Sequence, residues 1–118
     1  MTQTPSQPQG AWAWILQRLT AILLVVFLGT HIFVLHYVPE NLNINAAGVL
    51  LRFKSVLYLI IDSGFLATGL YHGLNGVRNV IFDFVVSPGA RTLINWVLLI
   101  VGIVFTAYGA YALTFFMK

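Results

Sequence analysis

No cysteine occurs among the 118 residues of the chain. This absence excludes disulfides, thiolate metal sites, cysteine-bound iron–sulfur clusters and covalently attached c-type haem within the chain. Charge is also scarce, since 8% of the residues are charged, against about a quarter in an ordinary soluble domain. The six basic residues are scattered singly, so the sequence does not predict nucleic acid as a partner.

Apolar residues dominate what is present. They make up 59% of the chain and the mean hydropathy is +0.90, which leaves too little polar surface to cover a soluble fold. Three apolar stretches each exceed the roughly 20 helical residues that a bilayer core requires, and they cover residues 11–38, 46–86 and 93–117. A polar loop at residues 39–45 and the turn sequence Ser87-Pro88-Gly89 separate them. The sequence therefore predicts an all-α membrane protein with three transmembrane helices.

The domain organisation is simple. Residues 1–10 are rich in proline, glutamine and threonine, which predicts a disordered N-terminal tail. Residues 11–118 are then a single three-helix transmembrane domain. The positive-inside rule does not orient this domain, because the basic residues divide evenly between the two membrane faces. Those on the N-terminal side are Arg18, Arg78 and Arg91, and those on the other side are Arg52, Lys54 and Lys118.

Ionisable side chains inside a bilayer are costly unless they are paired or ligated, so each is a candidate functional residue. The candidates are Arg18, His31, His36, Asp62, His72 and Asp83. If Arg18 and Arg78 mark one membrane face, helix rise places His31 roughly 20 Å and His72 about 9 Å from that face. The two histidines then lie on levels about 11 Å apart, too far for one metal centre. If they bind haem, they bind two haems, and each haem needs a second axial histidine from a partner chain.

Each of these features also has a purely structural explanation. His72 can form a hydrogen bond between helices, and the glycines one turn either side of it can allow close helix packing rather than admit a flat macrocycle. Asp62 is a candidate proton-relay acid, a partner that orients His31 or His36, or a helix–helix hydrogen-bonding residue. Two other function classes therefore stay open: a non-catalytic three-helix membrane scaffold, and a small proton-coupled transporter subunit that uses Asp62 and His72.

The segment Tyr71–Phe84, YHGLNGVRNVIFDF, resembles the haem-binding helix of a known family. This family comprises the small cytochrome b membrane-anchor subunits of succinate dehydrogenase and fumarate reductase, the succinate:quinone oxidoreductases of complex II. Its pattern is His-x3-Gly-x-Arg with an Asp five residues after the Arg, and here it falls on His72, Gly76, Arg78 and Asp83. The family's first helix starts with an Arg followed two positions later by Ser or Thr, which matches Arg18 and Thr20.

The resemblance implies roles for individual residues. His72 would be an axial ligand of haem b, and Arg18 and Arg78 would offset the charge of its propionates. Asp83 would sit near a quinone site at the same membrane face. In family members with two haems a first-helix histidine ligates the distal haem, and His31 matches that feature. The implied assembly is half of a heterodimeric helical anchor bundle, which shares one or two haem b groups with a second homologous anchor subunit.

The implied function is that of a membrane anchor within an enzyme complex. Succinate would be oxidised at a flavin in a flavoprotein subunit, and electrons would pass through an iron–sulfur subunit to quinone at the membrane face. The flavin chemistry is not in this chain. The resemblance also implies a bacterial-type cytoplasmic (inner) membrane, with the N-terminus in the cytoplasm and membrane lipid around the helices.

Three positions depart from the family pattern. Phe84 follows Asp83 where the family often has Tyr, so the phenol that would hydrogen-bond a quinone carbonyl is missing and would come from the partner anchor. Trp14 stands where some members carry a quinone-contacting Ser, and Asn79 replaces a frequent His.

Overall fold

The structure is a computed structural model that describes residues 10–37, 45–53 and 55–117. All regular secondary structure in these residues is helical, which confirms the all-α prediction. The helices are α1 (Ala11–Tyr37), α2 (Ala46–Phe53), α3 (Val56–Phe84) and α4 (Pro88–Met117). The predicted disordered tail, apart from Gly10, and the predicted loop, apart from Asn45, lie outside the described residues.

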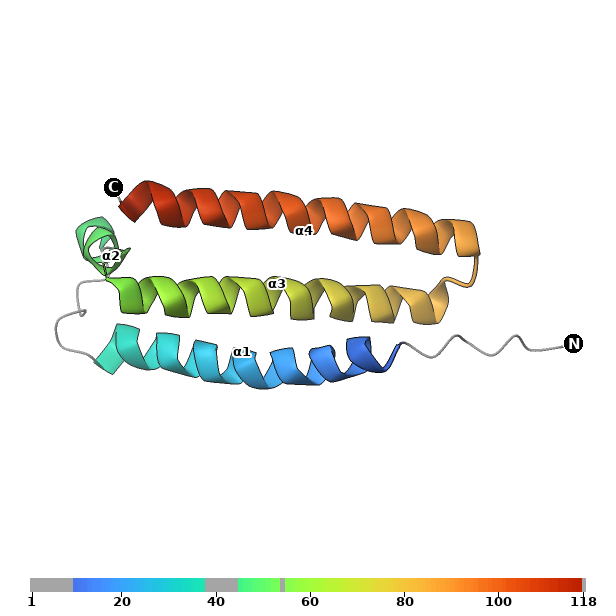
Figure 1. Ribbon diagram of the computed structural model, residues 1–118, viewed down its shortest axis with the longest axis horizontal. Coiled ribbons are helices and arrows are strands. Elements are labelled where there is room, and N and C mark those ends of the chain that lie inside the picture. Colours follow the sequence, from blue (N-terminus) through green and yellow to red (C-terminus); the bar gives the residue numbers. More distant parts are fainter. Residues whose placement is uncertain (1–9, 38–44, 54, 118) are drawn as a thin grey trace, which may run out of the picture.

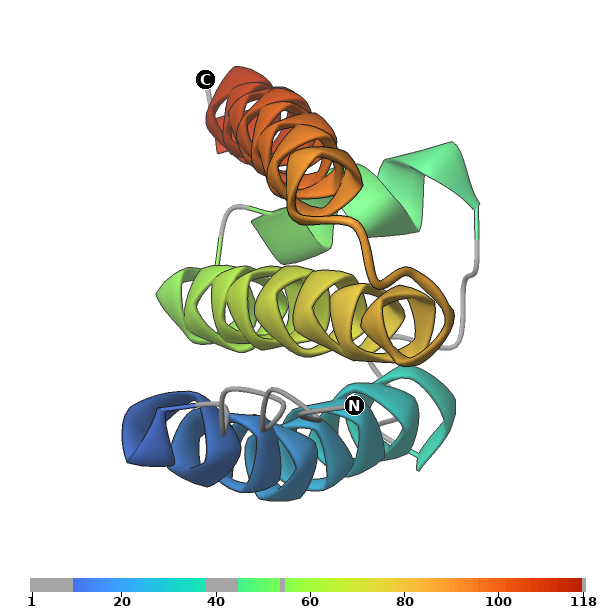
Figure 2. The same ribbon diagram turned by 90° about the vertical axis from the view of Figure 1, so that its right-hand side faces the viewer.

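The three long helices run antiparallel in a single layer, with α3 between α1 and α4 (Figures 1 and 2). The start of α1 and the connection between α3 and α4 lie at the same end of this layer. The short helix α2 lies at the opposite end and packs against α3 and α4. Because α3 is the central helix, it is the element that both of the other long helices contact.

The second apolar stretch is not one helix, as the sequence predicts, but two. Its first part forms α2, and the backbone then leaves helical geometry at Ser55, which has φ −89° and ψ 124°. The break follows Arg52 and Lys54 directly. Charged residues belong at the polar interface rather than in an apolar span, so the long helix begins only after them.

The third long helix begins earlier than the sequence predicts. Helix α4 starts at Pro88 instead of Leu93, and the connection to α3 shortens to residues 85–87. Proline suits a first helical turn, since its ring presets the helical φ and the N–H it lacks would have no partner there. The side chain of Arg91 closes the corner, because it donates hydrogen bonds to the carbonyl oxygens of Val85 at 2.7 Å and Phe82 at 2.9 Å.

The layer has almost no interior. Across the described residues only Ile61 and Thr20 are buried, each 7% exposed, while large apolar side chains cover the outside of the long helices. Segments Ala11–Val34 of α1 and Pro88–Phe115 of α4 are each long and apolar enough to cross a membrane. The sequence predicts three spans, whereas the described residues contain two candidate spans. The long helix that is not among them, α3, carries ionisable side chains along its length.

Candidate functional site

Polar contacts join α1 and α3 at two heights along the layer. At one height Gln17 and Thr20 of α1 contact His72 and Asn75 of α3. At the other, His31 of α1 contacts Asp62 of α3. Polar side chains inside an apolar helix pair are stabilised by facing one another, and these contacts fix the register of the two antiparallel helices.

His72 is held at its Nδ1 atom by α1. This nitrogen lies 3.2 Å from the carbonyl oxygen of Gln17 and 3.2 Å from the hydroxyl oxygen of Thr20. A carbonyl oxygen only accepts, and the Thr20 hydroxyl already donates to the Leu16 carbonyl at 2.7 Å. Nδ1 of His72 therefore carries the proton, and Nε2 keeps its lone pair.

The amide of Gln17 braces the same contact. Its Nε2 donates to the carbonyl oxygen of His72 at 3.2 Å, and its Oε1 accepts from Nδ2 of Asn75 at 2.6 Å. The sequence analysis did not identify Gln17 or Asn75. The signal for both was present, since each is an uncharged amide three residues from Thr20 or His72, on the same helix face.

His31 is held in the same way but by a charged group. Its Nδ1 donates to Oδ1 of Asp62 at 3.0 Å, and its ring stacks on Phe65 with the centroids 5.7 Å apart. The hydrogen bond leaves Nε2 of His31 with its lone pair. Two of the options that the sequence left open for Asp62 agree with this contact, namely orientation of His31 and a hydrogen bond between helices. His36 is exposed near the end of α1.

The two histidines lie farther apart in depth than the sequence predicts. His31 follows Thr20 by eleven residues on α1, so the two levels differ by about 16 Å rather than 11 Å. The separation of about 11 Å rests on the assumption that Arg18 and Arg78 lie at one depth in the membrane. The pairing of Gln17 with Asn75 places Arg18 deeper than Arg78 by about one helical turn, about 6 Å, and that assumption is wrong.

The glycines around His72 are not explained by contacts within this chain. A Cβ added at Gly69 would lie 3.7 Å from Leu24, and one added at Gly76 would lie 3.5 Å from Gln17, both ordinary contacts. A Cβ at Gly73 would meet nothing within 4 Å. A methyl group is therefore tolerated at all three positions by the described part of this chain.

The remaining predicted site residues do not gather at His72. Arg18 is exposed and folds over the Trp14 ring, with Cζ 3.4 Å from the ring centroid. Arg78 turns toward α4 and donates from Nε to Oδ1 of Asn95 at 2.8 Å. Asp83 is exposed near the end of α3, about 13 Å beyond the level of Arg18. The structure thus brings His72 to α1 and Arg78 to α4, on different faces of α3.

One polar atom near His72 lacks a partner. The Oδ1 atom of Asn79 is buried and accepts no hydrogen bond from any residue that the structure describes. Asn79 follows His72 by two helical turns and therefore lies on the same face of α3. Buried polar atoms are nearly always hydrogen-bonded in complete proteins, so this face is one where the isolated chain leaves a polar atom unsatisfied.

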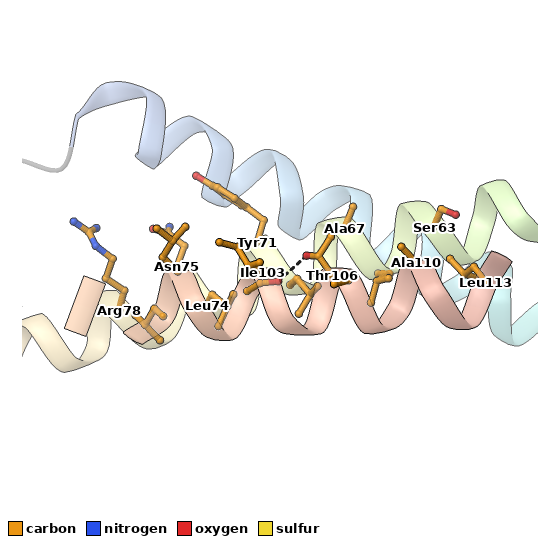
Figure 3. A pocket seen from close by; sticks show the side chains of 16 residues that line it. Ser63, Ala67, Tyr71, Leu74, Asn75, Arg78, Ile103, Thr106, Ala110 and Leu113 are labelled. Atoms are coloured by element: carbon orange, nitrogen blue, oxygen red, sulfur yellow. Dashed lines mark hydrogen bonds between the residues drawn. The ribbon is translucent and has the colours of Figure 1, made fainter. Parts of the chain in front are cut away.

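Two cavities flank α3. The larger, about 870 Å³, is a groove between α3 and α4 with Arg78 and Asn75 toward one end and Leu113 toward the other (Figure 3). The smaller, about 480 Å³, is lined by the His31–Asp62 pair together with Gly69 and Gly109. The imidazole of His31 therefore borders open space within the apolar part of the bundle. In the ranges that the structure covers, no three His, Cys, Asp or Glu side chains converge as metal ligands.

Known proteins have sequences similar to this chain along most of its length. A family profile described as succinate dehydrogenase/fumarate reductase transmembrane subunit matches residues 2–110. The succinate dehydrogenase 2 membrane subunit SdhC of Mycobacterium tuberculosis is 30% identical over 93 residues, covering 75% of this chain and 65% of that protein. The succinate dehydrogenase hydrophobic membrane anchor subunit of Thermoplasma acidophilum is 27% identical over 116 residues, covering 92% and 89%. The chain thus spans somewhat less than two thirds of the mycobacterial relative and most of the archaeal one.

Proposed function

Because the chain belongs to the family of succinate dehydrogenase/fumarate reductase transmembrane subunits, we propose that it is a cytochrome b membrane anchor that crosses the bilayer three times. In this proposal it binds haem b through His72 and His31 and contributes to a quinone site. The observation that carries the proposal is that both histidines are fixed by a hydrogen bond at Nδ1. In its neutral form each imidazole then has its lone pair on Nε2 and is oriented for ligation, as metal-binding histidines are.

The residues present fit a haem in three respects. The donor set is imidazole, which is the usual axial ligand of haem b. Gly73 beside His72 has open space around it, and His31 borders a cavity. With an imidazole on each side of the iron, a bound haem would supply one-electron transfer without an open position for oxygen.

A second anchor chain completes the proposed site. The two histidines lie about 16 Å apart along the helices, so each would serve a different haem, and the second imidazole for each haem would come from a homologous anchor subunit. The further proposed partners are the iron–sulfur and flavoprotein subunits that carry electrons from succinate.

The quinone would bind where α1 begins and α3 ends. In the proposal Arg18, stacked on Trp14, offers a cation to a quinone carbonyl or a haem propionate. Asp83 is an exposed carboxyl at the same end of the bundle and would move protons to and from the quinone oxygens. Arg78, held by Asn95 on the α4 side, would act on a propionate only from that side of α3.

Three crossings follow if α3 spans together with α1 and α4. Helix α3 has 29 residues, a length of about 44 Å, which exceeds the roughly 30 Å of a bilayer core. Its polar side chains at His72, Asn75 and Asp62 are satisfied by α1. We place the N-terminus on the cytoplasmic side of an inner membrane, where the soluble subunits would dock.

Optical spectra of the purified complex test the proposal. We expect a b-type α-band in the reduced-minus-oxidised spectrum. The variants H31A and H72A should each remove about half of this signal, because each removes the axial ligand of a different haem. Absence of a b-type band from the wild-type complex would overturn the haem assignment. A band that neither variant diminishes would overturn the choice of ligands.

The transporter alternative needs Asp62 and His72 to work together. These residues lie ten positions apart on α3 and contact different parts of α1, so no observation favours that function. The scaffold alternative is favoured by no observation of its own, and it predicts no b-type α-band in the same spectra.

A further inference from the structure

The two histidines are held by acceptors of different charge. His31 donates from Nδ1 to the carboxylate of Asp62 at 3.0 Å, whereas Nδ1 of His72 faces only a backbone carbonyl and a hydroxyl, each at 3.2 Å. Asp62 is the one acidic side chain that contacts a histidine among the described residues. Both histidines donate from Nδ1, but only His31 has a charged group beside it.

The geometry around His31 keeps this contact in place. Phe65 stacks on the imidazole at an interplanar angle of 26°, and Asp62 and Phe65 lie one turn apart on α3. The two side chains together fix both the plane and the direction of the ring. The side chains of His31 and Asp62 are 33% and 25% exposed and both line the neighbouring cavity, so the pair is accessible from that side.

A carboxylate at this position changes what His31 offers to a metal. Accepting the Nδ1 proton increases the electron donation of the imidazole through Nε2. The fixed negative charge also favours the more positive, oxidised state of a bound iron, and it acts strongly because the apolar surroundings screen it poorly. Both effects favour ferric over ferrous iron. At His72 the acceptor is a neutral carbonyl oxygen, so the first effect is weaker and the fixed charge is absent.

We propose that Asp62 is a positioning residue that lowers the reduction potential of the haem held by His31 more than that of the haem held by His72. This inference rests on the proposed function, since it concerns the haems assigned there. In this role the intramembrane carboxylate of Asp62 tunes a reduction potential, which is a different task from proton transfer or helix packing. Because Asp62 lies beside only one of the two histidines, the two haems would have different reduction potentials.

Potentiometry of the purified complex at one fixed pH tests the inference, with the absorbance of the b-type bands as the readout. The variant D62N keeps a hydrogen-bond acceptor beside Nδ1 and removes the charge. We expect one haem to become easier to reduce by tenfold or more in its one-electron equilibrium constant, equal to about 59 mV per tenfold. The other haem should shift by a smaller amount. D62E, which keeps the charge, should restore most of the wild-type potential.

The neighbouring residue supplies the matched control. Ser63 lies beside Asp62 but lines the groove on the α4 side, so S63A should leave both potentials at their wild-type values. Unchanged potentials in D62N, or equal shifts of both haems, would overturn the role of Asp62 while leaving the haem assignment intact. If D62N loses one haem, a D62E variant that retains it at the wild-type potential supports the role, and a shifted potential in D62E overturns it. A wild-type complex without haem overturns the proposed function and this inference with it.

Discussion

Gln17 connects α1 to α3 through both ends of its side-chain amide, which contact the His72 carbonyl and the Asn75 amide. In an apolar setting such interhelical hydrogen bonds contribute about 0.6–2 kcal/mol each. The change Q17L keeps the volume of the side chain and removes both bonds. We expect it to lower the free energy of unfolding by about 1–2 kcal/mol, measured by steric trapping or by denaturation in mixed detergent micelles.

A polar side chain on α4 provides the comparison. The hydroxyl of Thr106 donates only to the Gly102 carbonyl of its own helix, at 2.7 Å. T106V should therefore change the unfolding free energy by much less than Q17L does. Equal effects of the two variants would mean that the Gln17 bridge contributes nothing to the association of α1 with α3.

Helices α1 and α3 approach most closely between their two polar contacts. An added Cβ at Gly64 would come within 2.5 Å of the Phe27 ring, so G64A must displace either the ring or the helix. We expect G64A to destabilise the helix pair by about 1–3 kcal/mol, the usual cost of an overpacked contact. The same unfolding measurement applies. Gly73, also in the middle of α3, has open space around it, and G73A should be tolerated.

A second change distinguishes this contact from a loss of backbone freedom. Replacing the ring in the double variant F27L/G64A should recover part of the stability lost in G64A, because the smaller side chain makes room for the methyl group. No recovery would place the cost of G64A outside the Phe27 contact.

The helices themselves could largely be predicted from the sequence, whereas their register could not. Hydropathy and length identify α1 and α4 almost completely, and helical spacing correctly places Gly69 and Gly76 on the face of His72 that meets α1. Register depends on how side chains interlock, as Phe27 does against Gly64, and a single sequence carries no direct signal of that fit. For this reason the sequence puts Arg18 and Arg78 at one depth in the membrane and does not identify Gln17 as a contact of α3.

The candidate site was predictable to the same extent. His31 and His72 stand out as intramembrane histidines, and a carboxylate such as Asp62 in an apolar stretch needs a partner. Which histidine pairs with Asp62 depends on the register of α1 against α3. The position of the break between α2 and α3, before Ser55, depends on where the membrane interface falls. Both are properties of the assembled layer rather than of any one segment.

The molecule as a whole is a layer of three helices with extents of 65 × 25 × 19 Å, and its ends can be mapped because the chain has no cysteine of its own. Single cysteines at A11C and S87C should react with a membrane-impermeant maleimide from the same side of oriented vesicles. A46C should react only from the other side. Ala46 lies at the start of α2 and Ser87 in the connection to α4, so the segment between them contains all of α3, and this pattern requires that segment to cross the bilayer.

Labelling of all three cysteines from one side would contradict three crossings, because α3 would then not pass through the bilayer. The vesicles should first be shown to be sealed, with a reagent that reacts only after detergent is added. Under that condition the experiment also fixes which face carries the N-terminus.

The polar contacts between α1 and α3 have a consequence for how the chain enters a membrane. An Asp in a lone apolar helix opposes insertion, by up to about 3 kcal/mol at the helix centre, and α3 carries Asp62 along with His72 and Asn75. Helix α1, which precedes it in synthesis, holds the partners for all three. We therefore expect α1 to assist the insertion of α3, so that α3 enters the bilayer together with α1 as a helical hairpin rather than alone.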